Sequence, residues 1–171
     1  MTANETNAPL KEFVISRVLD APRERVWRAW TEVEHLAKWF GPKGTVIISA
    51  KNDLHPGGIF HYGMKGPDGE VMWGKWTYKE IAPPSKLVLV NSFSDEAGGL
   101  TRHPLASGWP LEMLTTATLE EKNGGKTLLT VRWIPINPTD EERKTFMAGF
   151  ESMKGGWTGT MEQLEAYLRI Q

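Results

Sequence analysis

Apolar residues near the C-terminus recur at helical spacing over a long stretch, and this pattern constrains the fold most. They are Phe146, Phe150, Met153, Trp157, Met161, Leu164 and Leu168. Steps of three and four residues place all of them on one face of a helix. Thr139-Asp140-Glu141-Glu142 has the spacing of a capping box and predicts where that helix begins. A helix of about thirty residues is about 45 Å long, so the rest of the chain must offer an equally long apolar surface.

Four glycines interrupt this predicted helix. They are Gly149, Gly155, Gly156 and Gly159. Each costs about 1 kcal/mol relative to alanine inside a helix. Close approach to a sheet, a kink or room for a ligand would each account for their presence.

The middle of the chain has the pattern of an antiparallel sheet. A first strand is predicted at 13–19, followed by two short helices; Pro22 favours the start of the first, and Gly41-Pro42 ends the second. Six further strands are predicted at 46–48, 59–65, 70–79, 87–93, 111–119 and 129–133. A long loop, 98–110, lies between two of these strands, and loops of that length are usually functional or mobile.

The tight turn Gly66-Pro67-Asp68-Gly69 predicts a hairpin in which Lys65 pairs with Glu70. This register places Trp73 on the same face as Tyr62. Continuing it would bury lysines, so we expect a bulge at Gly74 that returns Trp76 to the inner face.

Composition excludes several classes of protein. The chain has 20 basic and 21 acidic residues and a net charge of -1, so we expect no nucleic-acid partner. It has no cysteine, which excludes disulfides, thiolate nucleophiles and cysteine-ligated metals. Residues 1–11 predict a flexible leader before a single domain at 12–171. With neither a signal peptide nor a membrane span, we expect a cytoplasmic protein.

Metal and cofactor sites are not expected either. His35, His55, His61 and His103 have no partner at ligand spacing, so no metal motif exists, and no cofactor is expected. The sequence also lacks the G-x-S-x-G pattern of a nucleophilic serine. Weak candidates for a general acid or base are Glu80, Asp95 and His103, although a solvated loop with salt bridges explains the loop residues as well.

Eight tryptophans are more than a core of this size needs. With other large apolar residues on the inner faces, they define candidate ligand-binding residues. These are Trp39, Phe40, Tyr62, Trp73, Trp76, Phe93, Met113, Phe146, Phe150, Met153 and Trp157. A solid core is the alternative; the helix glycines and the surplus of tryptophan favour a pocket.

A strand, two short helices, about six antiparallel strands and one long helix form the order of the helix-grip fold. We therefore expect an α+β protein of the START/Bet v 1-like type, a curved antiparallel sheet wrapped around the C-terminal helix. Within that superfamily the sequence resembles the proteins similar to the C-terminal domain of the Hsp90 ATPase activator over residues 12–169. The matching segments are Arg17-x-x-x-Ala21-Pro22-x-x-x-Val26-Trp27-x-Ala29-Trp30, Trp39-Phe40-Gly41-Pro42, Pro56-Gly57-Gly58, Tyr78-x-Glu80-Ile81-x-Pro83-Pro84-x-x-Leu87-Val88, Gly125-Lys126-Thr127-x-Leu129-Thr130-Val131 and Gly156-Trp157-x-x-x-Met161-x-x-Leu164-x-x-Tyr167-Leu168.

The resemblance implies a pocket but leaves its ligand open. We expect binding of a hydrophobic or aromatic small molecule between the helix and the sheet, gated by the 95–110 loop and without catalysis. A polyketide cyclase, dehydratase or hydrolase using the same cavity is the alternative. Regulation of an Hsp90-type chaperone is the least favoured, because only the family's name points to it. A homodimer is left open.

Overall fold

The computed structural model describes residues 9–170 of the 171-residue chain. Most of the leader predicted at 1–11 therefore lies outside the described residues. In chain order the elements are β1 (Phe13–Leu19), α1 (Arg23–Thr31), α2 (Val33–Trp39), β2 (Val46–Asn52), β3 (Ile59–Lys65), β4 (Val71–Ala82), β5 (Lys86–Ser94), β6 (Leu100–Thr101), β7 (Met113–Lys122), β8 (Lys126–Pro135), α3 (Asp140–Ala148) and α4 (Phe150–Arg169).

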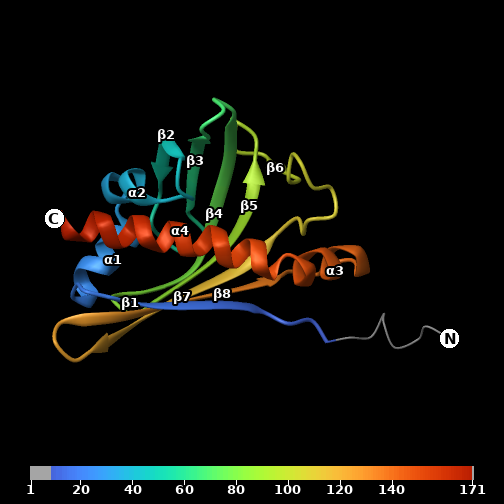
Figure 1. Cartoon of the computed structure of the whole chain (residues 1–171). Coiled ribbons are helices and arrows are strands. Elements are labelled where there is room, and N and C mark those ends of the chain that lie inside the picture. The colour runs from blue at the N-terminus through green and yellow to red at the C-terminus, as the bar shows by residue number, and fades with distance from the viewer. Residues whose placement is uncertain (1–8, 171) are drawn as a thin grey trace.

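One curved antiparallel sheet forms the body of the molecule, and α4 lies across one face of it (Figure 1). The strand order is β1-β8-β7-β5-β4-β3-β2, with β6 paired to β5. The apolar stripe of α4 meets the sheet and the two short helices, and its Met161 and Leu164 are 1% and 0% exposed. This confirms the predicted helix-grip, Bet v 1-like fold.

The predicted hairpin register is wrong by one residue. Lys65 pairs with Val71, not Glu70, so Tyr62 pairs with Gly74 and no bulge forms there. A side chain at Gly74 would clash with the Tyr62 ring, so this glycine makes room for the ring on the inner face. Trp73 consequently lies on the opposite face from Tyr62, where its ring stacks on His61 with centroids 5.2 Å apart. The register shift in β4 occurs later, after Tyr78.

The C-terminal helix is two helices instead of the single one predicted. The break is at Gly149, where the indole of Trp109 comes within 3.4 Å of the position that a Cβ would take. Gly149 thus provides both a kink and a close approach. At Gly155 and Gly156, by contrast, a Cβ would meet open space: apart from the neighbouring residues and the backbone of the same helix, no described atom lies within 4 Å of it.

The predicted capping box is present at the start of α3. Thr139 Oγ1 accepts a hydrogen bond from the Glu142 N–H, and the Glu142 carboxylate accepts one from the Thr139 N–H. The same carboxylate pairs with Arg102 Nη1 at 3.0 Å and is 8% exposed. The hydrogen bond from the Thr139 N–H, followed by the contact with Arg102, lowers the pKa of Glu142 from its ordinary value of 4.5.

We expect Glu142→Ala to lower the free energy of unfolding at pH 7 by about 1–2 kcal/mol, because it removes a helix cap and a charge-assisted hydrogen bond. A carboxyl whose pKa is lower in the folded than in the unfolded state stabilises the fold above pH 4.5, and this stabilisation is lost as the pH falls through the folded pKa. Urea unfolding at pH 7 and pH 3 measures the free energy of unfolding of both proteins. The difference in this free energy between wild type and variant should be smaller at pH 3 than at pH 7. Glu142→Gln, which keeps the capping geometry, should lose less, and an equal difference at both pH values would contradict this account.

Candidate functional site

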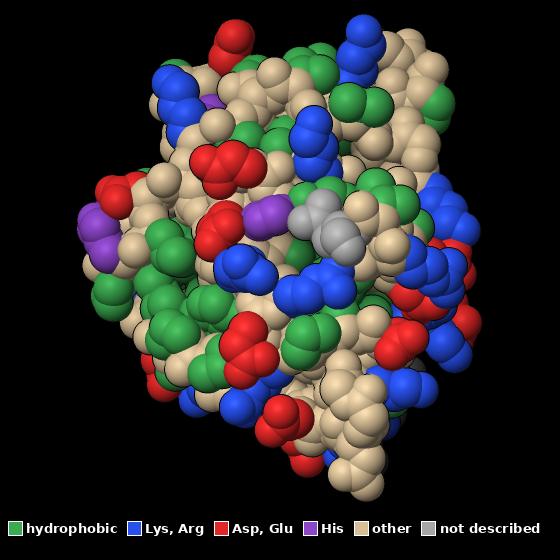
Figure 2. Space-filling model, turned by 90° about the vertical axis from the view of Figure 1, so that its left-hand side faces the viewer, with side chains coloured by type: hydrophobic (Ala, Val, Ile, Leu, Met, Phe, Trp, Pro, Cys, Tyr) green, Lys and Arg blue, Asp and Glu red, His purple; other side chains and the backbone are tan. Residues whose placement is uncertain are grey.

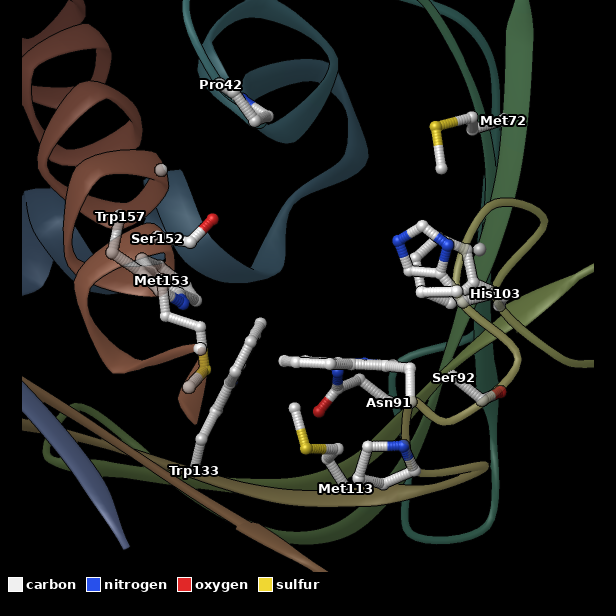
Figure 3. Close-up of a pocket in the computed structure, with 18 of the residues that line it drawn as sticks. Pro42, Met72, Asn91, Ser92, His103, Met113, Trp133, Ser152, Met153 and Trp157 are labelled. Carbon is white, nitrogen blue, oxygen red and sulfur yellow. The ribbon is translucent and has the colours of Figure 1, made fainter. Parts of the chain in front are cut away.

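A cavity of about 810 Å³ lies between α4, the sheet and the loop that follows β6. In Figure 3, Met153 and Trp157 enter it from α4, His103 and Met72 lie across from them, and Met113 and Trp133 form the floor. The lining residues are Phe40, Gly41, Pro42, Tyr62, Met64, Met72, Trp73, Gly74, Asn91, Ser92, Phe93, His103, Ala106, Trp109, Pro110, Met113, Trp133, Thr145, Ala148, Gly149, Ser152, Met153, Gly156, Trp157 and Thr160. Aromatic and other apolar side chains dominate this lining, and none of these residues is Asp, Glu, Lys or Arg.

Seven of the predicted ligand-binding residues border the cavity. They are Phe40, Tyr62, Trp73, Phe93, Met113, Met153 and Trp157. Trp73 borders it from β4, but its ring packs on the far face of the sheet beside His61. The prediction of an inward-facing Trp73 ring followed from the wrong hairpin register.

The other four predicted residues do not border the cavity: three are buried in the core, and the fourth is partly buried and packs against it. Trp39, Trp76 and Phe146 are 2%, 4% and 0% exposed. The Trp39 indole donates a hydrogen bond to the Ala29 carbonyl at 2.8 Å, and the Trp76 ring packs edge-on against Phe60.

Phe150 is the fourth, and it packs against Phe13 with ring centroids 5.8 Å apart. It is the first residue of α4, directly after the break at Gly149, and Phe13 belongs to β1.

Several lining residues are not among those predicted from the sequence, notably Met64, Met72, Asn91, Trp109 and Trp133. A signal was present for Trp133, because it alternates with Leu129 and Val131 on the inner face of β8. Met72 was assigned to the wrong face by the shifted register. Trp109 belongs to a loop, where no periodicity could place it.

The segment after α2 and the loop after β6 are each joined to a helix at the rim of the cavity. Gln163 Nε2 of α4 donates to the Gly41 carbonyl at 2.6 Å, and Lys43 forms an ion pair with Glu162. On the other side, the Arg102–Glu142 ion pair ties the loop after β6 to α3. The predicted loop 98–110 is further anchored by β6, in which Leu100 and Thr101 pair with β5.

His103 is the one weak catalytic candidate that the structure places at the cavity. Its ring lies 4.5 Å from Phe93, and its Nδ1 accepts a hydrogen bond from the Leu105 N–H at 3.0 Å. Because Nδ1 is the acceptor, the proton of the neutral ring is on Nε2. Burial lowers the pKa of His103 below 6.5, so the ring is neutral at pH 7.

Glu80 and Asp95 lie outside the cavity. Glu80 pairs with Lys86 at 3.1 Å on the surface, and Asp95 accepts a hydrogen bond from the Gly99 N–H in a turn. Arg17, for which a structural pair with a carboxylate such as Glu80 is the sequence-based expectation, instead pairs with Glu165 of α4 at 2.7 Å.

The described part of the chain contains neither a cluster of metal-ligating side chains nor a helix able to cross a membrane. Between residues 9 and 170, no three His, Asp or Glu side chains gather where they could hold a metal ion. Within the same residues no helix has the length and apolar character needed to cross a membrane. Figure 2 shows Lys, Arg, Asp and Glu side chains interspersed on the face around the C-terminal end of α4.

Comparison with known proteins agrees with this architecture. A structure from Nitrosomonas europaea is 28% identical, with a TM-score of 0.72 over 95% of this chain and 96% of that chain. One from Chromobacterium violaceum is also 28% identical, with a TM-score of 0.68 over 91% of this chain and 94% of that chain. A Mycobacterium smegmatis structure shares the fold at 24% identity, with a TM-score of 0.74 over 93% and 91% of the two chains.

The comparison with curated proteins finds no match. The family model described as activator of Hsp90 ATPase homolog 1-like protein matches residues 20–169, which is most of the chain. Together with the Bet v 1-like sheet and long C-terminal helix, this match confirms the resemblance seen in the sequence. The chain therefore belongs to the family of activator of Hsp90 ATPase homolog 1-like proteins.

Proposed function

We propose that the protein binds a hydrophobic or aromatic small molecule in the cavity between α4 and the sheet, without catalysing a reaction on it. The observation that carries the proposal is the cavity itself, about 810 Å³ in volume and lined mainly by apolar side chains. Cavities of about 300–1,000 Å³ with apolar walls and a few polar groups are typical of small-molecule sites.

The aromatic walls favour a flat ligand. The rings of Trp133 and Trp157 meet edge to face at 5.4 Å, and Trp109 faces His103 at 6.4 Å. Rings that line a cavity can pair with another ring in offset or edge-on geometry. The cavity thus supplies contacts that a planar molecule can use on several sides.

Titration with the neutral probe N-phenyl-1-naphthylamine tests the proposal. Its fluorescence rises on transfer from water to an apolar site, so we expect a saturable signal with one probe bound per chain. The probe should be recovered chemically unchanged after incubation. A signal that never saturates, or one equal to that of a protein without a cavity, would contradict binding at this site.

An enzyme that uses the same cavity is the second candidate, and His103 is the observation in its favour. The ring is neutral at pH 7 and borders the cavity, as a general base requires. Incubating the protein with a small-molecule extract and following the loss of any compound by mass spectrometry tests this role. Turnover that disappears in His103→Phe would favour the enzyme over the non-catalytic binder.

Chaperone regulation is the third candidate, and its support is the wording of the family description. Mixing the protein with an Hsp90-type ATPase and measuring ATP turnover tests it. An unchanged rate is the result we expect.

A further inference from the structure

Several nitrogen hydrogen-bond donors on the cavity wall are not used by the fold. Trp133 Nε1 is buried there without a partner among the described residues, and His103 and Asn91 each carry a further unused donor. His103 donates nothing from Nε2, because its contact with the Leu105 N–H is made by Nδ1. Asn91 accepts a hydrogen bond from the Thr115 hydroxyl through Oδ1, which leaves its NH₂ group unpaired. Within residues 9–170, neither of these two donors has a partner. Both residues border the cavity, and Figure 3 shows His103 across from α4 and Asn91 beside Met113 on the floor.

The wall carries no full charge that could balance a charged ligand. Its lining contains no carboxylate, ammonium or guanidinium group, and burial keeps His103 neutral at pH 7 by lowering its pKa. A buried ionic group without a partner of opposite charge loses its hydration without compensation. The cavity therefore disfavours fatty-acid and other carboxylate ligands.

We propose that the ligand is an uncharged, flat molecule whose carbonyl-type oxygen accepts a hydrogen bond from His103 Nε2–H, with the Asn91 NH₂ group as a second donor. This inference rests on the proposed function, because it specifies which molecules the same cavity takes. A ligand acceptor would pair with donors that otherwise stay unpaired next to an apolar space. The hydroxyl groups of the wall can donate or accept, so these nitrogen donors set the preference.

Three naphthalene derivatives of similar size distinguish the effect of ligand shape on affinity from the effect of ligand polarity. These are 2-acetonaphthone, which carries a carbonyl group, 2-isopropylnaphthalene, which is purely apolar, and 2-naphthoate, which is negatively charged. Equilibrium dialysis at pH 7 measures the dissociation constant of each. We expect the carboxylate to bind at least roughly a hundredfold more weakly than the ketone, because it would be buried without a counter-charge.

The variant His103→Phe tests the proposed donor. It keeps a ring beside Phe93 and removes Nε2–H. We expect the affinity for the ketone, relative to that for the isopropyl compound, to fall by about fivefold to tenfold, the effect of one lost hydrogen bond. His61→Phe is the matched control, because this histidine lies on the opposite face of the sheet against Trp73. It should leave the ratio unchanged.

The outcomes distinguish this inference from the proposed function. If none of the three compounds binds, the proposed function is wrong and the inference falls with it. If the compounds bind but the carboxylate matches the ketone, or the ratio is unchanged in His103→Phe, the inference is wrong and the proposed function stands. If the ratio falls in His103→Phe alone, the inference is confirmed.

Discussion

Replacing Leu164 with alanine is expected to lower the free energy of unfolding by about 3–4 kcal/mol. Leu164 lies on the stripe of α4 and is 0% exposed. Its truncation removes buried apolar surface and leaves a void that a sheet on one side and helices on the other cannot close. Urea unfolding followed by tryptophan fluorescence measures the change.

Leu105→Ala is the control for this experiment, since the same atoms are removed from a side chain that is 87% exposed. Its effect should stay within about 0.5 kcal/mol. A loss at Leu164 as small as the loss at Leu105 would show that α4 is not docked on the sheet as described.

Gly156→Leu is expected to weaken binding of N-phenyl-1-naphthylamine by at least roughly a hundredfold, equivalent to about 2.7 kcal/mol of binding free energy. Gly156 borders the cavity, and apart from its chain neighbours and the backbone of its own helix no described atom lies within 4 Å of the position of its Cβ. The leucine side chain would thus occupy space that the probe needs. Replacing a helix glycine should at the same time raise the free energy of unfolding, by up to about 1 kcal/mol.

Gly155→Leu is the matched control for Gly156→Leu. Gly155 is the preceding residue of the same helix, is exposed, and is not among the cavity residues. It should gain similar helix stability and bind the probe as wild type does. Equal binding by the two variants would place the probe outside the cavity.

The fold could be predicted from the sequence because its strongest signals are local. The spacing of Trp157, Met161 and Leu164 requires a long apolar surface on which the helix can pack. Apolar and polar residues alternate in β7 and β8, and this alternation predicts a sheet with such a surface on one face. The capping box at Thr139 also predicted the start of α3 correctly. These features depend on residues a few positions apart, so no long-range information is needed.

The hairpin register and the helix break depend on contacts between distant segments. Tyr62 needs the missing side chain of Gly74 on a neighbouring strand, and Trp109 packs over Gly149 from a loop about forty residues earlier. A glycine indicates that space is needed at its position, but the sequence does not show which distant side chain occupies that space. The predicted bulge and the unbroken helix were wrong for this reason.

The candidate site was predicted in outline from the sequence. Large inward-facing side chains such as Met113 and Trp157 border the cavity, whereas Trp76 and Phe146 fill the core. Periodicity identifies an inner face, but core and cavity share that face. The unpaired donor of His103 depends on its contact with Leu105, which the sequence alone does not show.

Methionine methyl groups provide the most direct test of ligand binding in the cavity. Met72, Met113 and Met153 border it, whereas Met161, also on α4, is buried in the core and does not border it. With methyl-labelled methionine, nuclear magnetic resonance spectra recorded during titration with 2-acetonaphthone should show saturable shifts of these cavity methyls, to which Met64 also belongs, and an unchanged Met161. Unchanged cavity methyls at saturating ketone, or shifts confined to Met161, would contradict the account.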